Sequence, residues 1–193
     1  MQKKMLLITL IAALALPAAF SARPRAWAEE AVKYTPGWRA RVFSAPQNFI
    51  ITESPPNTEL ASFEATKPLY ELAKYSQQAK GAPEAPFVLW TAVGFLNVEE
   101  AGNYVFTALS DIEQVPKAIY IEDNLVATGK VYALMAAREL EPGLYKIEFR
   151  IFGSGRNDRY NLINTAFKFL VKRPSDDRGL PISEVLLTPA KKK

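Results

Sequence analysis

The sequence predicts an all-β fold, an antiparallel sandwich of two sheets in a jelly-roll-like arrangement, with one short helix inserted near residues 66–80. Two observations lead to this prediction. Fourteen prolines and nine glycines divide the chain into short apolar segments, the rhythm of strands joined by turns. Residues 144–152 alternate between large apolar side chains and mainly charged ones, the period of a strand with one face in a core.

The strands follow one another with polar turns between them. Segment 87–98 is apolar almost throughout, so we expect it to be buried on both faces or bent near Gly94. The pair Pro142-Gly143 favours a tight hairpin, because proline fixes one corner and glycine permits a positive φ at the next. The predicted strands are 38–45, 49–52, 87–98, 104–109, 118–121, 125–126, 131–140, 144–152, 166–171, 180–182 and 185–187.

Residues 57–82 are predicted to be an insertion lying against the sheet, and they contain the one helical pattern. Pro68 can occupy the first turn of a helix, and Leu69 and Leu72 begin a small apolar face with helical spacing. Gly81 ends the pattern. The rest of 29–190 is expected to form a single β-sandwich domain, followed by a basic tail at 191–193.

Residues 1–28 predict a secretory signal peptide. Lys3 and Lys4 precede an apolar run of about 15 residues, shorter than the roughly 20 that a membrane-spanning helix needs. Cleavage after Ala28 is favoured over cleavage after Ser21, and an uncleaved signal-anchor is the less favoured alternative. We therefore expect a periplasmic, secreted or cell-surface protein without an integral membrane span after cleavage.

Composition excludes several classes of function. The chain has no cysteine and no histidine, which rules out disulfides, thiol nucleophiles, Cys/His zinc sites and Ser-His-Asp triads. The net charge of +4 belongs to the precursor: residues 1–28 carry four basic groups and no acid, so 20 basic and 20 acidic groups remain. Three of these basic groups are the terminal lysines. Nucleic-acid binding requires a basic surface, so no nucleic-acid partner is expected.

The order of turns and strands from Trp90 onward resembles the protective-antigen-type β-sandwich, a domain found in anthrax protective antigen, yeast flocculins and bacterial glycosidases. The resemblance covers about 100 residues well and is carried by turns and strands without a catalytic signature. The matching segments are Trp90-Thr91-Ala92-Val93-Gly94-Phe95-Leu96, Glu100-Ala101-Gly102-Asn103-Tyr104-Val105-Phe106, Leu109-Ser110-Asp111, 118–126, 140–148 and 180–186.

The resemblance implies where a ligand would bind. Sugar-binding members hold calcium with two consecutive aspartates in the loop after the Tyr-x-Phe strand, but here that loop reads Ser110-Asp111-Ile112-Glu113. Ile112 offers no oxygen ligand, so a solvated turn is favoured over a calcium site built from Asp111, Glu113 and Asp158. No cofactor is expected, although calcium stays open. The candidate ligand-binding residues lie in loops 110–116 and 153–161: Ser110, Asp111, Glu113, Arg156, Asn157, Asp158 and Tyr160.

Two other groups have mainly structural interpretations. The pair Asp176-Asp177 is expected to form a solvated turn beside Arg173 and Arg178. Glycoside hydrolysis needs two facing carboxyl groups, and nothing in the sequence selects such a pair.

The sequence therefore favours an exported, non-catalytic sandwich that acts as a recognition or assembly subunit of the cell envelope. Its partner is expected to be an envelope protein or a cell-surface glycan. A calcium-assisted carbohydrate-binding module and a carboxylate-based glycan hydrolase are the alternatives.

Overall fold

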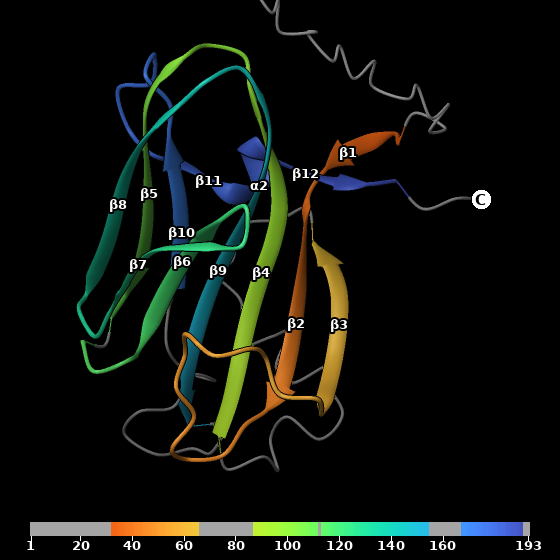
Figure 1. Cartoon of the computed structure of the whole chain (residues 1–193), viewed down its shortest axis with the longest axis vertical. Helices are drawn as coiled ribbons and strands as arrows, with labels where there is room; N and C mark the ends of the chain where they lie inside the picture. The colour runs from red at the N-terminus through yellow and green to blue at the C-terminus, as the bar shows by residue number, and fades with distance from the viewer. Residues whose placement is uncertain (1–31, 66–86, 112, 155–166, 191–193) are drawn as a thin grey trace, which may run out of the picture. The chain divides into compact units, whose positions relative to one another are not determined.

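The alternating segments build two antiparallel sheets (Figure 1). The computed structural model describes residues 32–65, 87–111, 113–154 and 167–190, all within the unit Val32–Lys193. In these residues the larger sheet contains β1 (Tyr34–Pro36), β2 (Trp38–Ser44), β3 (Glu59–Ala65), β4 (Phe87–Val98), β6 (Lys117–Ile121), β7 (Asn124–Gly129), β9 (Gly143–Ser154) and β12 (Leu186–Pro189). The smaller sheet contains β5 (Gly102–Ser110), β8 (Ala133–Leu140), β10 (Phe167–Lys172) and β11 (Leu180–Pro181).

Strand β4 is the centre of the larger sheet. It pairs with β9 from Phe87↔Ser154 to Val98↔Gly143, and its other side is shared by β2 and β12. The sheet order is β1-β12-β4-β9-β6-β7, with β2 also paired to β3, and the smaller sheet has the order β11-β10-β5-β8. The all-β two-sheet sandwich predicted from the sequence is confirmed.

Large side chains fill the space between the sheets. Trp38, Tyr104, Phe106 and Phe149 are almost completely buried there. The rings of Phe149 on β9 and Phe169 on β10 stack with centroids 4.6 Å apart, which joins one sheet to the other. Side chains alternate along each strand, so every second residue faces this core and the residues between them face outward. The packing of the core therefore fixes which side chains lie on the outer faces of the sheets.

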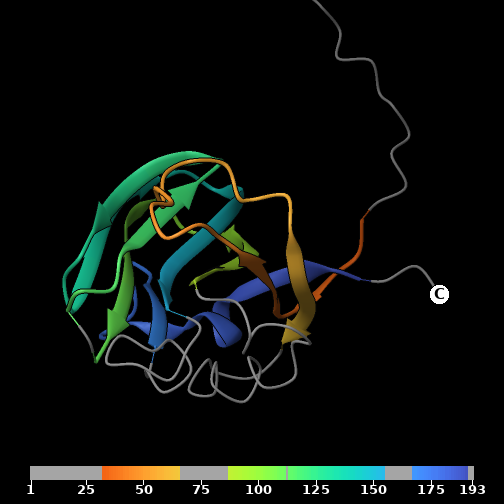
Figure 2. The ribbon, with the colours of Figure 1, turned by 90° about the horizontal axis from the view of Figure 1, so that it is seen from below.

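Residues 45–58 cover part of the outer face of the larger sheet (Figures 1 and 2). Ile51 is buried in a second apolar cluster that includes Phe43, Leu89 and Phe152. The predicted strand at 49–52 is therefore wrong. These residues form turns, and the side chains of Phe49 and Ile51 pack onto the sheet instead of adding a strand to its edge.

Part of the predicted insertion is a strand. Strand β3 pairs with β2, and the ring of Phe63 packs edge-on against Trp90 with centroids 6.0 Å apart. The sequence Glu-Leu-Ala-Ser-Phe-Glu-Ala has good helix formers, but pairing with β2 overrides that weak local preference. The helix predicted near 66–80, the signal peptide 1–28 and the tail 191–193 lie outside the described residues.

The turn at Pro142-Gly143 does not close a hairpin. Strand β8 pairs with β5 in the smaller sheet, whereas β9 pairs with β4 and β6 in the larger one. Gly143 also lacks the positive φ that the hairpin would use. The turn carries the chain from the smaller sheet to the larger one. A Pro-Gly pair is compatible with both a hairpin and such a crossing between sheets, so it does not distinguish them.

A short helix, α2 (Ile182–Val185), interrupts the predicted strand at 180–182 and leads into β12. Beside it, a Cβ atom on Gly94 would lie 2.9 Å from Cβ of Leu186, so glycine lets β12 approach β4 closely. Among the described residues, no helix has the length and apolar character to cross a membrane.

Candidate functional site

The loop that follows β5 lies at one end of the sandwich, together with the corner between β7 and β8. The backbone N–H of Ser110 donates a hydrogen bond to the carbonyl oxygen of Tyr132 at 2.9 Å, which joins the two segments. Asp111 and Glu113 are exposed, whereas Ser110 is buried. We call the surface formed by residues 110–111, 113–116 and 130–132 the loop end.

Tyr132 is the feature of the loop end that sequence reasoning missed. Tyr132 is 56% exposed, and its carbonyl oxygen accepts the hydrogen bond from Ser110, the residue that precedes Asp111. An aromatic residue in the short corner Gly129-Lys130-Val131-Tyr132 is a signal of a binding surface that can be seen in the sequence. The predicted strand 131–140 includes Tyr132 and therefore hides this signal. In the structure this strand, β8, begins at Ala133, and Tyr132 lies in the corner before it.

Lys117 holds the loop end from inside. It is the first residue of β6, it is fully buried, and its Nζ donates hydrogen bonds to the carbonyl oxygens of Val115 at 3.1 Å and Val131 at 2.6 Å. One carbonyl belongs to each of the two segments. Burial lowers the pKa of Lys117 to about 8 because the ammonium group is removed from water. The loop end therefore depends on an internal ammonium group that links both of its segments.

The structure places only three of the seven candidate ligand-binding residues. Ser110, Asp111 and Glu113 lie together at the loop end, while Arg156, Asn157, Asp158 and Tyr160 lie outside the described residues. Phe167, the first residue of β10, pairs with Ser110, so the chain re-enters the smaller sheet beside the loop end.

The described residues do not fit a calcium site. Calcium takes six to eight oxygen ligands, and in the described parts of the chain no three acidic side chains gather closely enough to hold a metal ion. Asp111 and Glu113 are both exposed on the turn. Asp158, the third candidate ligand, lies outside the described residues, so the choice between a solvated turn and a calcium site stays a prediction.

A polar pair, Glu148 and Arg150, is buried on the outer face of the larger sheet. Arg150 donates to the carboxylate of Glu148 and to the carbonyl oxygens of Ile51 and Glu53, and its guanidinium lies 4.1 Å from the ring centroid of Tyr120. These contacts fasten residues 45–58 to the sheet. The contacts of Arg150 and Glu148 are thus made within the fold and serve to hold residues 45–58.

Solved structures with the same fold include three that illustrate its range. The PA14 domain of the MpAFP antifreeze protein superposes with a TM-score of 0.55 at 18% identity, covering 81% of this chain and 92% of that one. An anti-sigma factor domain-containing protein also gives 0.55 at 14% identity, over 80% of this chain and 48% of that one, so this chain spans about half its length. The epithelial adhesin 9 A domain from Candida glabrata, solved with Galb1-4GlcNAc, gives 0.51 at 12% identity over 81% and 90%.

These likenesses show a PA14-like β-sandwich, the protective-antigen-type fold that the order of turns and strands predicted. No protein-family model and no curated protein matches the sequence. At this level of identity the structures establish the fold, and the chemistry of the site comes from the residues of this chain.

Proposed function

We propose that this chain is an exported, non-catalytic recognition module of the cell envelope that binds a cell-surface glycan through its loop end. The observation that carries the proposal is the backbone bond between Ser110 and Tyr132, which joins the segment of the exposed Tyr132 to the segment that carries the exposed Asp111 and Glu113. An aromatic face packs against the C–H side of a sugar ring, and carboxylates accept hydrogen bonds from its hydroxyl groups.

The fold supports this choice of ligand. The adhesin 9 A domain, which shares the fold, was solved with a disaccharide. A sandwich whose interior is filled by side chains binds ligands with its loops, since the sheets hold the loops in fixed positions. Lys117 supplies that rigidity here by joining the segments on both sides of the site.

The same residues favour binding over catalysis. Glycoside hydrolysis uses one acid that an apolar environment keeps protonated and a second carboxylate opposite it. Asp111 and Glu113 are exposed to water on one turn, which gives neither of them such an environment. Export is supported by the basic and apolar character of residues 1–28.

Retention on immobilised oligosaccharides and envelope polysaccharides tests the proposal. We expect the purified protein to be retained with or without a chelator, and Tyr132→Ala and Asp111→Asn to weaken binding about tenfold, the loss expected for one stacking or charged hydrogen-bond contact. Met135→Ala and Glu139→Gln are matched controls, because both side chains are exposed on β8 beyond the corner.

The proposal fails if no glycan retains the wild-type protein, or if both loop-end variants bind as tightly as their controls. Binding that disappears with the chelator would instead support the calcium-assisted alternative.

A further inference from the structure

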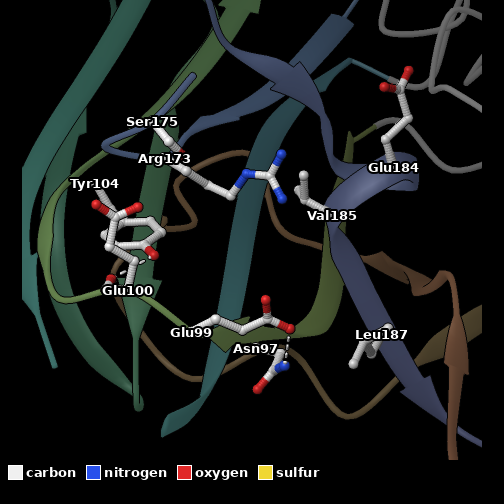
Figure 3. Close-up of a pocket in the computed structure, with 9 residues that line it drawn as sticks. All are labelled: Asn97, Glu99, Glu100, Tyr104, Arg173, Ser175, Glu184, Val185 and Leu187. Carbon is white, nitrogen blue, oxygen red and sulfur yellow. Dashed lines mark hydrogen bonds between the residues drawn. The ribbon is translucent and has the colours of Figure 1, made fainter. Parts of the chain in front are cut away.

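A pocket of about 270 Å³ lies at the end of the sandwich opposite the loop end (Figure 3). Strand β5 separates the two: Tyr104, near its first residue, lines the pocket, and Ser110 at its last residue belongs to the loop end. Nine strand residues extend about 30 Å. The walls come from β4, the β4–β5 turn, β5, the segment after β10, α2 and β12.

One wall is a fixed guanidinium group. Arg173 donates from Nε and Nη2 to the two carboxylate oxygens of Asp176, both at 2.9 Å, and its backbone N–H donates to the same carboxylate at 3.0 Å. These bonds raise the pKa of Arg173 and lower that of Asp176, since each group stabilises the charged form of the other. The turn expected beside Arg173 thus contains an ion pair, which the spacing of residues did not predict and which holds the arginine at the pocket.

The backbone beside this wall requires glycine. Gly102 has a φ of +152°, and a Cβ atom there would lie 2.8 Å from Pro174. Glycine thus lets the turn after β10 lie directly on the start of β5. This contact sets the position of Arg173, which directly precedes the proline.

The opposite wall carries an exposed carboxylate. Glu99 accepts a hydrogen bond from Nδ2 of Asn97 at 3.1 Å, and the hydroxyl of buried Tyr104 donates to the carbonyl oxygen of Glu100 at 2.9 Å, which fixes the turn that carries both glutamates. Figure 3 shows the guanidinium of Arg173 reaching toward Val185, with Glu99 and Asn97 across the pocket from it.

The remaining wall is aliphatic and comes from Val185 and Leu187. The pocket therefore combines a guanidinium group held by Asp176, exposed carboxylates and an apolar side. We propose that it is a second binding site, for a single sugar ring that is neutral or carries an amino group. Planar donors and acceptors bind vicinal hydroxyl groups in pairs, while the aliphatic wall contacts the C–H face of the ring.

Size and charge define this ligand further. The volume lies just under the roughly 300 Å³ at which small-molecule sites begin, which is room for a single ring. Asp176 balances the charge of Arg173, whereas Glu99, Glu100 and Glu184 add negative charge at the walls and rim. Uronic acids and other acidic sugars are consequently disfavoured.

This site does not depend on the proposed function of the loop end, because the two share no residue. If both bind sugars, the chain can bridge two glycan strands, and avidity from two weak sites then exceeds the affinity of either.

Amide chemical shifts of the full chain, titrated with glucose, glucosamine and glucuronic acid, test the proposal. We expect glucose or glucosamine to shift the amides of Glu99, Gly102 and Ser175 with a Kd of about 1 mM, typical of weak single-site binding, and glucuronic acid to bind more weakly. Glu99→Gln should weaken binding about tenfold by removing a charged acceptor, and Asn97→Ala, which releases Glu99, should weaken it as well.

Two further variants separate the sites and check for general effects. Glu139→Gln, an exposed glutamate on β8, and Asp111→Asn at the loop end should bind the monosaccharide at this pocket like the wild type. The proposal is overturned if none of the three sugars shifts these amides, if glucuronic acid binds best, or if Glu99→Gln and Asn97→Ala both leave the Kd unchanged.

Discussion

The ammonium nitrogen of Lys117 lies 2.6 Å from the carbonyl oxygen of Val131, inside the sandwich and at the base of the loop end. The same nitrogen reaches the carbonyl of Val115, so one side chain satisfies carbonyls in both segments of the site. Burial is the cause of its lowered pKa, and the lysine is held by neutral carbonyl groups. A hydrophobic residue at this position would leave both carbonyls without their donor.

Lys117→Met should change how stability depends on pH. The pKa of Lys117 is about 8 when folded and near 10.5 in the unfolded chain, so the unfolded chain binds more protons between these values. The free energy of unfolding of the wild type should therefore rise relative to that of Lys117→Met by roughly 1–3 kcal/mol from pH 8 to pH 10.5. Urea unfolding of both proteins across this range measures the difference, and parallel curves would contradict it.

Gly94→Ala should destabilise the fold by about 1–3 kcal/mol, because the new methyl group overpacks a tight contact. It would lie 2.9 Å from Cβ and 3.0 Å from Cδ1 of Leu186, which anchors β12 to β4. Gly143→Ala is the control, since its nearest neighbour would be 3.6 Å away and its φ is not positive. Equal unfolding midpoints for the two variants would show that β12 can move aside without cost.

Arg150→Lys should loosen residues 45–58 from the larger sheet. Lysine cannot reproduce the planar set of bonds to Glu148 and Glu53 or the stacking on Tyr120, so we expect a loss of about 1–3 kcal/mol. Hydrogen exchange of the amides in 45–58 should become faster. Arg39→Lys, whose ion pair with Glu64 is largely exposed, should change stability by less than about 1 kcal/mol; similar effects of both substitutions would contradict the assigned role of Arg150.

Strand periodicity predicted the sandwich well where one or both strand faces are buried. Segment 87–98 is β4 to the residue, and the alternating segment 144–152 lies within β9. The prediction failed at 49–52 and 59–65. Whether such a short segment pairs or folds over the sheet depends on partners distant in sequence, Leu89 for Ile51 and Trp90 for Phe63, which no local pattern reveals.

The loop end was predicted in part. Asp111 and Glu113 follow a recognisable strand, so their position came from the sequence, but Tyr132 and Lys117 belong to other elements and join the site only through tertiary contacts. The pocket around Arg173 could not be foreseen either. The pocket forms because Gly102 lies against Pro174 and because α2 supplies one of its walls. The spacing of residues along the chain predicts neither feature.

Mapping the amide shifts of the loop end with a retained oligosaccharide tests the central claim most directly. We predict that the largest shifts fall on Ser110, Asp111 and residues 130–132, and that Tyr132→Ala needs about tenfold more oligosaccharide to reach them while Met135→Ala behaves like the wild type. Shifts that bypass these residues, or that saturate at the same oligosaccharide concentration in Tyr132→Ala as in the wild type, would contradict glycan recognition by the loop end.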